Sequence, residues 1–243
     1  MLTTLNYSPN FDINKRKLKD IKFIVFHYTG MNNEKEAFKK LNNINSKVSC
    51  HYFIKNNGEV VTLVPNLYVA WHAGISNWKK YKSLNKFSIG IEISNPGHNF
   101  KYRRFSKKQI IAIIKLSRFL IKKYKIKKEN IVGHSDIAPD RKIDPGEKFP
   151  WKYLSKKKIG YWHNLNYQKL VKERKVSTNN LEKIKFIKNL NKLGYSQNYK
   201  IKKNTYIKVL TSAFQRRFRQ DIVNGIIDKE CLSISENLLK NLE

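Results

Sequence analysis

The alternation of apolar and polar residues predicts two short buried strands, each followed by a histidine. Residues 21–26 form an apolar run rich in β-branched and aromatic side chains, which ends at His27 and a Tyr-Thr-Gly turn. A second short run, residues 130–133, ends at His134. Chemistry is often carried at strand ends, where a rigid scaffold holds a loop, so both imidazoles are candidate functional groups.

A third predicted strand places a carboxylate opposite an apolar face. Residues 88–94 alternate strictly, with Ile89, Ile91 and Ile93 on one side. Because successive side chains of a strand point to opposite faces, Glu92 lies on the other side. We therefore expect Glu92 in mid-strand, pointing away from the core.

The rest of the first 155 residues alternates predicted strands with predicted helices. This order favours an α/β fold with a mixed central β-sheet flanked by helices. Residues 135–151 are rich in Pro, Gly and Asp and predict a loop. The other expected elements are a helix over residues 34–41, strands at 48–54 and 59–64 around an Asn56-Asn57-Gly58 hairpin, and a helix that follows an N-cap at Ser106 and ends at Tyr124.

After about Lys175 the spacing of apolar residues becomes helical throughout. We expect three parts: an α/β domain at 1–155, a basic linker at 156–177 and a small C-terminal three-helix module at 178–243. The expected helices are marked by Leu181, Ile184, Ile187 and Leu190, by Tyr206, Leu210, Ala213 and Phe214, and by a segment from Asp228 to Leu242.

The composition is strongly basic. The 243 residues include 50 Lys and Arg against 18 Asp and Glu, a formal net charge of +32. Such a charge attracts polyanions, among them nucleic acid, anionic lipid and an acidic wall polymer. The lysines are spread along the chain, however, and no segment interleaves them with aromatic side chains. Compositional drift therefore explains most of the charge, and we expect no specific nucleic-acid partner.

Other features narrow the class of protein. No apolar run approaches the roughly 18–20 residues that a membrane-spanning helix needs, so we expect no transmembrane segment. The first twenty residues lack the apolar region of a secretory signal. Cys50 and Cys231 are too few and too far apart for a disulfide scaffold or a cysteine-based zinc cluster.

Two histidines and an aspartate form a candidate metal site. Asp144 follows His134 by ten residues, and His27 ends the other strand. Two imidazoles and one carboxylate suit Zn²⁺, and three protein ligands leave a fourth position for water. Spacing alone does not decide the matter, because the chain has no local histidine pair of the HExxH type, and structural histidines are the competing interpretation.

Five motifs carry a resemblance to a known family. They are FHYTG, VSCHYFI, AWHAG, IGIEISNPG and GHSDIAPDRKIDPGEKFPW, within about residues 7–155. In this order and spacing they resemble the type-2 N-acetylmuramoyl-L-alanine amidases of the AmpD/AmiD type, whose fold is shared with phage amidases and peptidoglycan recognition proteins. A later segment within residues 178–242, AFQRRFRQDIVNGIIDKE, is similar to a three-helix peptidoglycan-binding domain.

The resemblance implies a zinc enzyme that hydrolyses the amide between N-acetylmuramic acid, or its anhydro form, and L-alanine. The family's zinc ligands fall on His27, His134 and Asp144. Its catalytic glutamate falls on Glu92, which would accept a proton from water and pass it to the departing amine. Lys142 matches the family's basic residue and would stabilise the developing oxyanion.

The resemblance also places three residues in the substrate groove. His51, Trp71 and His72 would hold muramyl or peptide groups, with packing or support of neighbouring side chains as the competing interpretation of each. Cys50 stands where phage relatives have a tyrosine, and we expect it to be a small buried residue rather than a ligand.

The expected partners are peptidoglycan or muropeptides. The alternative is a non-catalytic peptidoglycan-binding or recognition protein, against which the three ligands and Glu92 argue. A nucleic-acid-binding protein would rest on the charge alone. A wall-binding module favours the periplasm or cell envelope, whereas the missing signal favours the cytoplasm, another export route or a trimmed chain. The sequence decides neither this, nor the choice between intact sacculi and anhydro-muropeptides, nor the oligomeric state.

Overall fold

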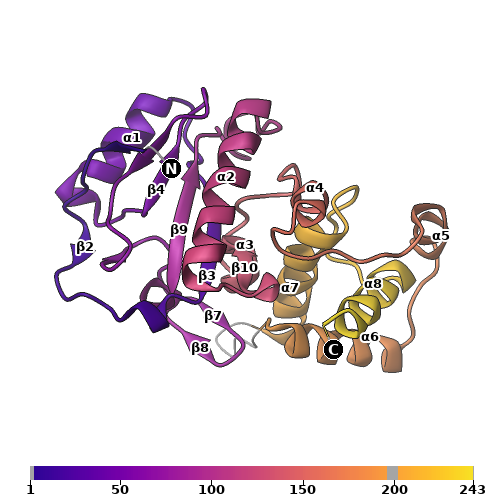
Figure 1. Cartoon of the computed structure of the whole chain (residues 1–243). Coiled ribbons are helices and arrows are strands. Elements are labelled where there is room, and N and C mark those ends of the chain that lie inside the picture. Colours follow the sequence, from indigo (N-terminus) through magenta and orange to yellow (C-terminus); the bar gives the residue numbers. More distant parts are fainter. Residues whose placement is uncertain (1–2, 196–201, 243) are drawn as a thin grey trace.

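A six-stranded mixed β-sheet forms the centre of the computed structural model, which describes residues 3–195 and 202–242 (Figure 1). The strand order is β1-β5-β4-β9-β3-β10, and every neighbouring pair is parallel except the antiparallel hairpin β4–β5. The strands are β1 (Thr4–Leu5), β3 (Phe23–Tyr28), β4 (Tyr52–Ile54), β5 (Val60–Thr62), β9 (Ser88–Ile93) and β10 (Ile131–Gly133).

Helices and short ribbons surround this sheet. Two small antiparallel ribbons pair β2 (Phe11–Asp12) with β6 (Val69–Ala70), and β7 (Asn77–Trp78) with β8 (Tyr81–Lys82). The helices are α1 (Glu34–Asn42), α2 (Lys107–Tyr124), α3 (His134–Ile137), α4 (Trp151–Lys156), α5 (Tyr167–Glu173), α6 (Asn180–Leu193), α7 (Lys203–Phe218) and α8 (Lys229–Lys240). Short 3-10 helices are η1 (Leu18–Asp20), η2 (Ile44–Ser46), η3 (Leu84–Phe87) and η4 (Lys128–Asn130).

Helix α2 covers one face of the sheet (Figure 1). It begins at the predicted N-cap, where the Ser106 hydroxyl accepts the Gln109 N–H and the Gln109 side chain accepts the Ser106 N–H. The three isoleucines of β9 are fully buried on this side, in one cluster with apolar residues of α2. The alternation in β9 is therefore confirmed.

The face of the sheet opposite α2 carries both buried core residues and the predicted site residues. Phe23 and Val25 of β3 are fully buried on that face, and His27 follows on the same side two residues later. His27 pairs in register with Glu92 of β9, which also points away from α2. One face of two adjacent parallel strands thus carries both a predicted metal ligand and the predicted catalytic carboxylate.

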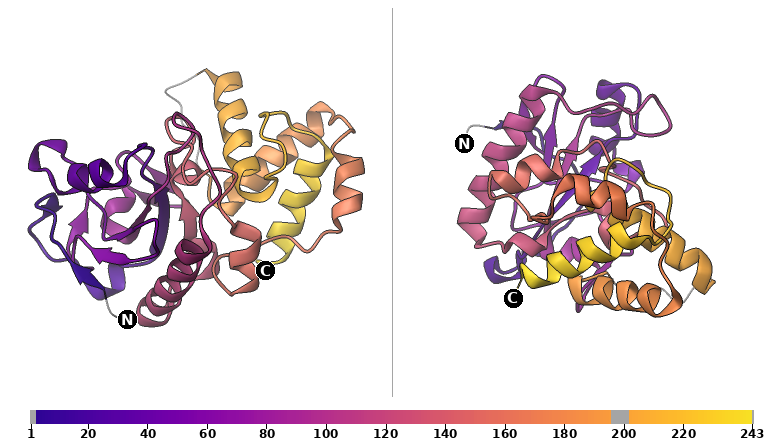
Figure 2. Two further views of the ribbon diagram at one scale, coloured as in Figure 1. Left: turned by 90° about the horizontal axis from the view of Figure 1, so that it is seen from above. Right: turned by 90° about the vertical axis from the view of Figure 1, so that its right-hand side faces the viewer.

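The C-terminal helices pack on this same face. Residues 3–155 form the α/β part, and residues 178–195 and 202–242 form the helical part. Their buried apolar residues form one cluster, in which Phe23 and Trp78 of the α/β part join Phe186, Leu210 and Phe214 of the helical part. Figures 1 and 2 show α7 directly beside α3 and α4. The three helices are confirmed, and their core continues into that of the α/β part.

Polar contacts also join the two parts. The Gly194 carbonyl accepts the Lys79 N–H at 2.7 Å. The Gln220 amide donates to the carbonyl oxygens of Glu147 and Phe149, at 2.6 and 2.7 Å. The helical part therefore packs against the α/β part through polar as well as apolar contacts.

Several local expectations differ from the structure. The expected loop at 135–151 contains α3, a four-residue helix that begins at His134 itself, and the expected linker at 156–177 contains α5. In α6 the buried side is formed by Phe186, Leu190 and Leu193, while two residues used to predict the helix are exposed: Leu181 and Ile184. Contacts with α8 and α7 select the buried side of this helix.

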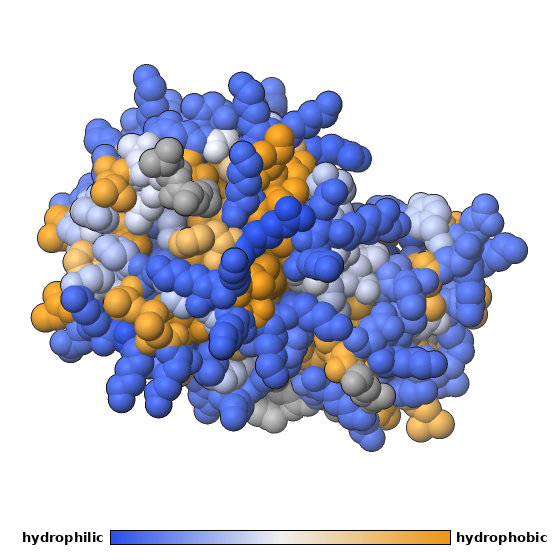
Figure 3. Space-filling view, in the orientation of Figure 1, coloured by the Kyte–Doolittle hydropathy of each residue, from blue (hydrophilic) through white to orange (hydrophobic). Residues whose placement is uncertain are grey.

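Hydrophilic residues cover both parts on the face shown in Figure 3 and do not gather into one stripe. Within the described residues, no helix combines the length and the apolar character needed to cross a membrane. Cys50 and Cys231 are both buried and unpaired, as expected for Cys50.

The shared core predicts that the two parts unfold together. Phe214 is fully buried against Phe186 and Phe218, with ring centroids 5.2 and 5.3 Å away. Phe214→Ala should lower the free energy of unfolding by about 3–5 kcal/mol because it leaves a cavity. All four tryptophans precede residue 163, so their fluorescence reports on the α/β part and the segment just after it.

Urea unfolding followed by tryptophan fluorescence and by circular dichroism should shift to the same lower midpoint in this variant. An unchanged tryptophan transition, with a separate earlier loss of helix, would show that the parts unfold independently.

Candidate metal centre and active-site cleft

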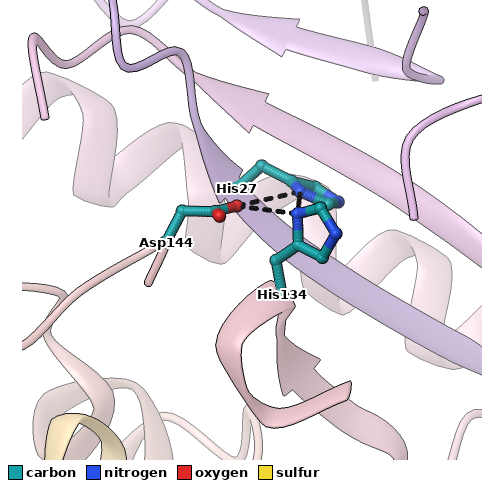
Figure 4. A group of neighbouring side chains, drawn as sticks. All are labelled: His27, His134 and Asp144. Atoms are coloured by element: carbon teal, nitrogen blue, oxygen red, sulfur yellow. Dashed lines mark hydrogen bonds and ion pairs between the residues drawn. The ribbon is translucent and has the colours of Figure 1, made fainter. Parts of the chain in front are cut away.

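Three side chains converge at the end of the sheet face that lies opposite α2. The His27 Nδ1 lies 2.9 Å from the His134 Nδ1, and the Asp144 Oδ2 lies 3.0 and 3.1 Å from these two atoms (Figure 4). All three residues are buried. The three predicted ligands are therefore brought together, from positions 117 residues apart at the extremes.

The local folding of three segments explains this convergence. His27 lies inside β3, one residue beyond Phe26, which pairs with Gly133 of the neighbouring parallel strand β10. His134 follows Gly133 as the first residue of α3. The loop that carries Asp144 is attached to α3, because the Ser135 N–H donates to the Asp144 carbonyl at 2.8 Å.

A chain of hydrogen bonds fixes the tautomer of His27. The Ser88 hydroxyl donates to the Leu84 carbonyl at 2.6 Å, so its oxygen is available to accept the His72 Nε2–H at 3.1 Å. The His72 Nδ1 then accepts the His27 Nε2–H at 3.0 Å. The chain leaves the lone pair of His27 on Nδ1, the atom that faces His134 and Asp144.

His134 is held in the same tautomer by a simpler contact. Its Nε2 lies 3.2 Å from the Ala73 carbonyl oxygen, which can only accept a hydrogen bond. Arg141 Nη2 lies 3.4 Å from the same nitrogen, but this amino group donates to the Ala73 and Ile75 carbonyls. The Nε2 therefore carries the proton, and Nδ1 is free to coordinate. Metal-bound histidines usually donate their second ring N–H in this way, so the donor set fits a divalent metal ion such as zinc.

The pKa shifts favour the protonation states that bind metal. Burial and the neighbouring His134 lower the pKa of His27 to about 4, which keeps its imidazole neutral. Burial alone would raise the pKa of Asp144, but its interactions with His134 and His27 outweigh burial and lower that pKa. Neutral imidazole and ionised carboxylate are the forms in which these side chains coordinate metals.

The predicted catalytic pair lies in the cleft beside the three ligands. The cleft has a volume of about 440 Å³, and its lining includes Glu92 and Lys142 together with the ligands. Burial and the negative charge of Asp144 raise the pKa of Glu92 to about 8, despite the opposing effect of Lys142 and Lys40. A carboxyl group that exchanges its proton near neutral pH suits general acid–base chemistry.

The three expected groove residues have different positions. Trp71 lines the cleft, and its indole N–H donates to Asp12 at 2.7 Å. His72 also lines the cleft, but both of its ring nitrogens are used in the chain that holds His27. His51 is fully buried and is absent from the cleft lining; its Nδ1 accepts the Gly90 N–H and its Nε2 lies 3.1 Å from the Tyr68 carbonyl. A direct substrate contact does not fit the position of His51.

Gly90 is needed for the position of His72. A Cβ added at Gly90 would lie only 2.4 Å from the His72 Cγ, so any side chain there would displace the ring. This close approach explains why β9 has a glycine at this position of the site face.

Other cleft residues were not predicted from the sequence. Arg141 ties the metal-site loop to the loop after β6, because its Nε donates to the Ile75 carbonyl at 3.0 Å and its Nη2 donates to the Ala73 carbonyl. Lys40 and Asn99 also line the cleft. Arg141 lies within the motif GHSDIAPDRKIDPGEKFPW but was given no role, and no sequence pattern distinguishes Lys40 from the other basic residues.

Comparison with known proteins agrees with this site. The family model described as Amidase_2, N-acetylmuramoyl-L-alanine amidase, matches residues 17–147. The N-acetylmuramoyl-L-alanine amidase AmiD of Escherichia coli (strain K12) is 36% identical over 233 residues, which cover 90% of this chain and 83% of that relative. The chain belongs to the Amidase_2 family of N-acetylmuramoyl-L-alanine amidases.

Solved structures show the same relationship over nearly the whole amidase chain. The structure of E. coli AmiD, in complex with anhydro-N-acetylmuramic acid-L-Ala-D-gamma-Glu-L-Lys, has a TM-score of 0.81 and 32% identity, and the match covers 95% of this amidase and 93% of AmiD. AmpDh3 from Pseudomonas aeruginosa, in complex with anhydromuramic pentapeptide, has a TM-score of 0.80 and 28% identity over 99% of both chains. The α/β fold predicted from the sequence is confirmed, and the amidase is a hydrolase.

The raised pKa of Glu92 makes a prediction about the stability of the metal-free amidase. Below about pH 4.5 the carboxyl is protonated in both folded and unfolded chains. Between pH 4.5 and about 8 the unfolded chain ionises first, so stability falls as pH rises. With a chelator present, Glu92→Gln should raise the free energy of unfolding by ~1–3 kcal/mol at about pH 9 and leave it unchanged near pH 4.

Urea unfolding at both pH values measures this difference. The control is Glu59→Gln on the β4–β5 hairpin, where a hydrogen bond from Lys55 lowers the pKa of the carboxyl and no gain at high pH is expected. Equal stability of Glu92→Gln and wild type at about pH 9 would contradict the prediction.

Proposed function

We propose that this amidase hydrolyses the amide between N-acetylmuramic acid, or its anhydro form, and L-alanine in peptidoglycan or its fragments, with zinc held by His27, His134 and Asp144. The observation that carries the proposal is the convergence of these three buried ligands beside Glu92 and Lys142 in one cleft. Cell-wall turnover or recycling is the corresponding role.

The metal part of the proposal rests on the donor set. The two coordinating nitrogens and the carboxylate oxygen lie within 4.8 Å of one another, and the second nitrogen of each histidine is hydrogen-bonded elsewhere. A bound zinc ion would supply Lewis acidity, which polarises a carbonyl and lowers the pKa of water. Other divalent metals share part of this chemistry, but two nitrogens with one oxygen are a common zinc set.

Glu92 transfers the proton, and Lys142 stabilises the developing negative charge. The Glu92 carboxylate accepts a proton from the attacking water and returns it to the departing amine, which its raised pKa permits near neutral pH. The Lys142 ammonium lies two residues before Asp144 and lines the same cleft, where it stabilises the negative charge that develops on the scissile carbonyl oxygen. Lys142 also favours the ionised form of Glu92 by its charge.

The substrate class follows from the relatives and from the charge of the cleft. AmiD and AmpDh3 were solved with anhydromuramyl peptides. In the present amidase, Lys40, Arg141 and Lys142 surround the same cleft. Stem peptides of peptidoglycan carry carboxylates, which these cations attract. A purely binding role is not favoured, because such a protein needs neither a converged ligand set nor a carboxyl group of raised pKa beside it.

The proposal predicts two distinct kinds of inactive variant. His134→Ala should lose both zinc and activity. Glu92→Gln should keep about one zinc per chain but lose about 10²–10⁴-fold in kcat/KM, because an amide cannot accept the proton. Metal analysis of the purified chains, with mass spectrometry of the products from a soluble anhydro-muropeptide and from intact sacculi, measures both effects.

A chelator should abolish turnover by the wild type, and added zinc should restore it. Stoichiometric zinc and full activity in His134→Ala would refute the ligand assignment. A Glu92→Gln variant with more than about half of the wild-type rate would refute the proton-transfer role.

We also propose that the helical part binds polymeric peptidoglycan. The buried Gln215 of α7 shapes a turn there: its side-chain oxygen accepts the N–H groups of Asn224 and Gly225, and its amide donates to the Ile226 carbonyl at 2.9 Å. The turn presents the Ile226 side chain to solvent, with 62% of it exposed. The turn lies within the segment that is similar to a three-helix peptidoglycan-binding domain, and that similarity is what supports the proposed binding role.

The full-length chain can test this second role. Ile226→Asp should weaken co-sedimentation with intact sacculi several-fold and leave hydrolysis of a soluble muropeptide unchanged, because the second binding site acts through effective concentration. Leu181→Asp is the matched control, since Leu181 is 78% exposed elsewhere in the helical part. Equal sedimentation of both variants and the wild type would exclude the turn as the binding surface.

A further inference from the structure

A buried aspartate next to the metal site is held by residues of the helical part. Asp136 lies two residues after His134 in α3 and is 1% exposed. Its Oδ2 accepts a hydrogen bond from Arg217 Nη1 of α7 at 2.7 Å, and its Oδ1 accepts the Tyr195 hydroxyl at 2.7 Å. Arg217 and Tyr195 are each 1% exposed as well, so this network is shielded from water.

The same carboxylate organises the backbone that carries His134. The Asp136 Oδ2 accepts the Gly133 N–H at 2.7 Å, which closes the first turn of α3 around His134. Gly133 is itself confined, because an added Cβ would lie 2.6 Å from Pro145 Cδ. Pro145 directly follows Asp144. The backbone around Asp136 is therefore in contact with the segments of two of the three ligands.

The guanidinium of Arg217 cannot shift without breaking several contacts. Its second amino group, Nη2, donates to the Ile131 carbonyl of β10 at 2.8 Å. Its Cζ lies 4.7 Å from the ring centroid of Trp151 and 5.2 Å from that of Tyr161. A planar, permanently charged group suits this position between rings and acceptors, and a lysine would not replace it.

We propose that Arg217 and Tyr195 are positioning residues of the metal centre: the helical part completes the scaffold of His134 through Asp136, in addition to any role in wall binding. The inference rests on the metal binding proposed above. Groups that orient metal ligands from outside typically change metal affinity by about 10–100-fold when they are lost. Loss of the Arg217 charge alone would leave the Asp136 carboxylate buried without its charged partner.

The test compares zinc affinity in three single variants of the full chain. Arg217→Gln removes the charged partner of Asp136, and Tyr195→Phe removes one hydroxyl while keeping the ring. Arg219→Gln is the matched control, because Arg219 is 3% exposed and pairs with Asp228 and Glu230 inside the helical part. Zinc dissociation constants come from competition with a chelator, with circular dichroism and tryptophan fluorescence as measures of folding.

Arg217→Gln should weaken zinc binding about 10–100-fold, and Tyr195→Phe should weaken it by a smaller factor, roughly 3–10-fold. Arg219→Gln should lower the unfolding midpoint but keep the zinc dissociation constant within about twofold of wild type. In the zinc-loaded Tyr195→Phe variant, kcat should fall more than KM rises, because the scaffold of the ligands changes and the substrate contacts do not.

Two results would overturn the inference. One is a folded Arg217→Gln variant that binds zinc as tightly as wild type. The other, decisive where Arg217→Gln does not fold, is a folded Tyr195→Phe variant with unchanged zinc affinity. A wild-type chain that binds no zinc would instead refute the proposed metal site, and this inference with it. The zinc affinity of the wild-type chain therefore tells the two failures apart.

Discussion

The structure depends on holding two largely buried imidazole rings and a carboxylate together at the bottom of the active-site cleft. Each of these groups loses hydration when it is buried, and each has more than one hydrogen-bonding atom. The fold meets this constraint by giving every ring nitrogen that faces away from the centre a protein partner: His72 for His27, and the Ala73 carbonyl for His134. The remaining atoms point at one another, which is a stable arrangement only when a cation lies between them or when protons are shared.

Parallel pairing of β9, β3 and β10 is what makes this arrangement possible. Parallel strands end at the same edge of a sheet, so the ends of β3 and β10 bring His27 and His134 together although 107 residues separate them. The same register sets Glu92 beside His27. On the other face, α2 buries the isoleucines of β9, which fixes the sheet in one orientation. The chemical face is therefore determined by the apolar pattern of the opposite face.

These relationships explain how much the sequence could predict. The strict alternation of β9 was enough to predict the side on which Glu92 lies, and the two strand ends were enough to identify the histidines, because both signals are local. The convergence with Asp144 came from the resemblance to a family and is a matter of tertiary structure. The role of His72, in the loop after β6, could not be predicted from spacing, since it depends on Gly90 of β9, which leaves room for the ring.

The helical part was predicted as helices but not as a part of the core. Apolar residues recur with a helical period when helices pack only on one another, and equally when they also pack on the α/β part. The sequence pattern is therefore the same in both cases. Arg217 illustrates the limit: it lies within the motif AFQRRFRQDIVNGIIDKE, but the motif does not indicate that this arginine is fully buried and ion-paired in the fold. Burial of a charge is a property of the tertiary structure alone.

The buried pair of Arg217 and Asp136 also restricts how such enzymes can be recombined. Joining this α/β part to a foreign wall-binding domain would leave an anion without a counter-ion at the junction, and joining the helical part to another hydrolase would leave a cation in the same condition. Only chimeras that retain both charges, or that replace both with apolar residues of matching shape, would avoid an unpaired buried charge at the interface. In this architecture one buried ion pair spans the junction, and the α/β part and the helical part are therefore inherited together.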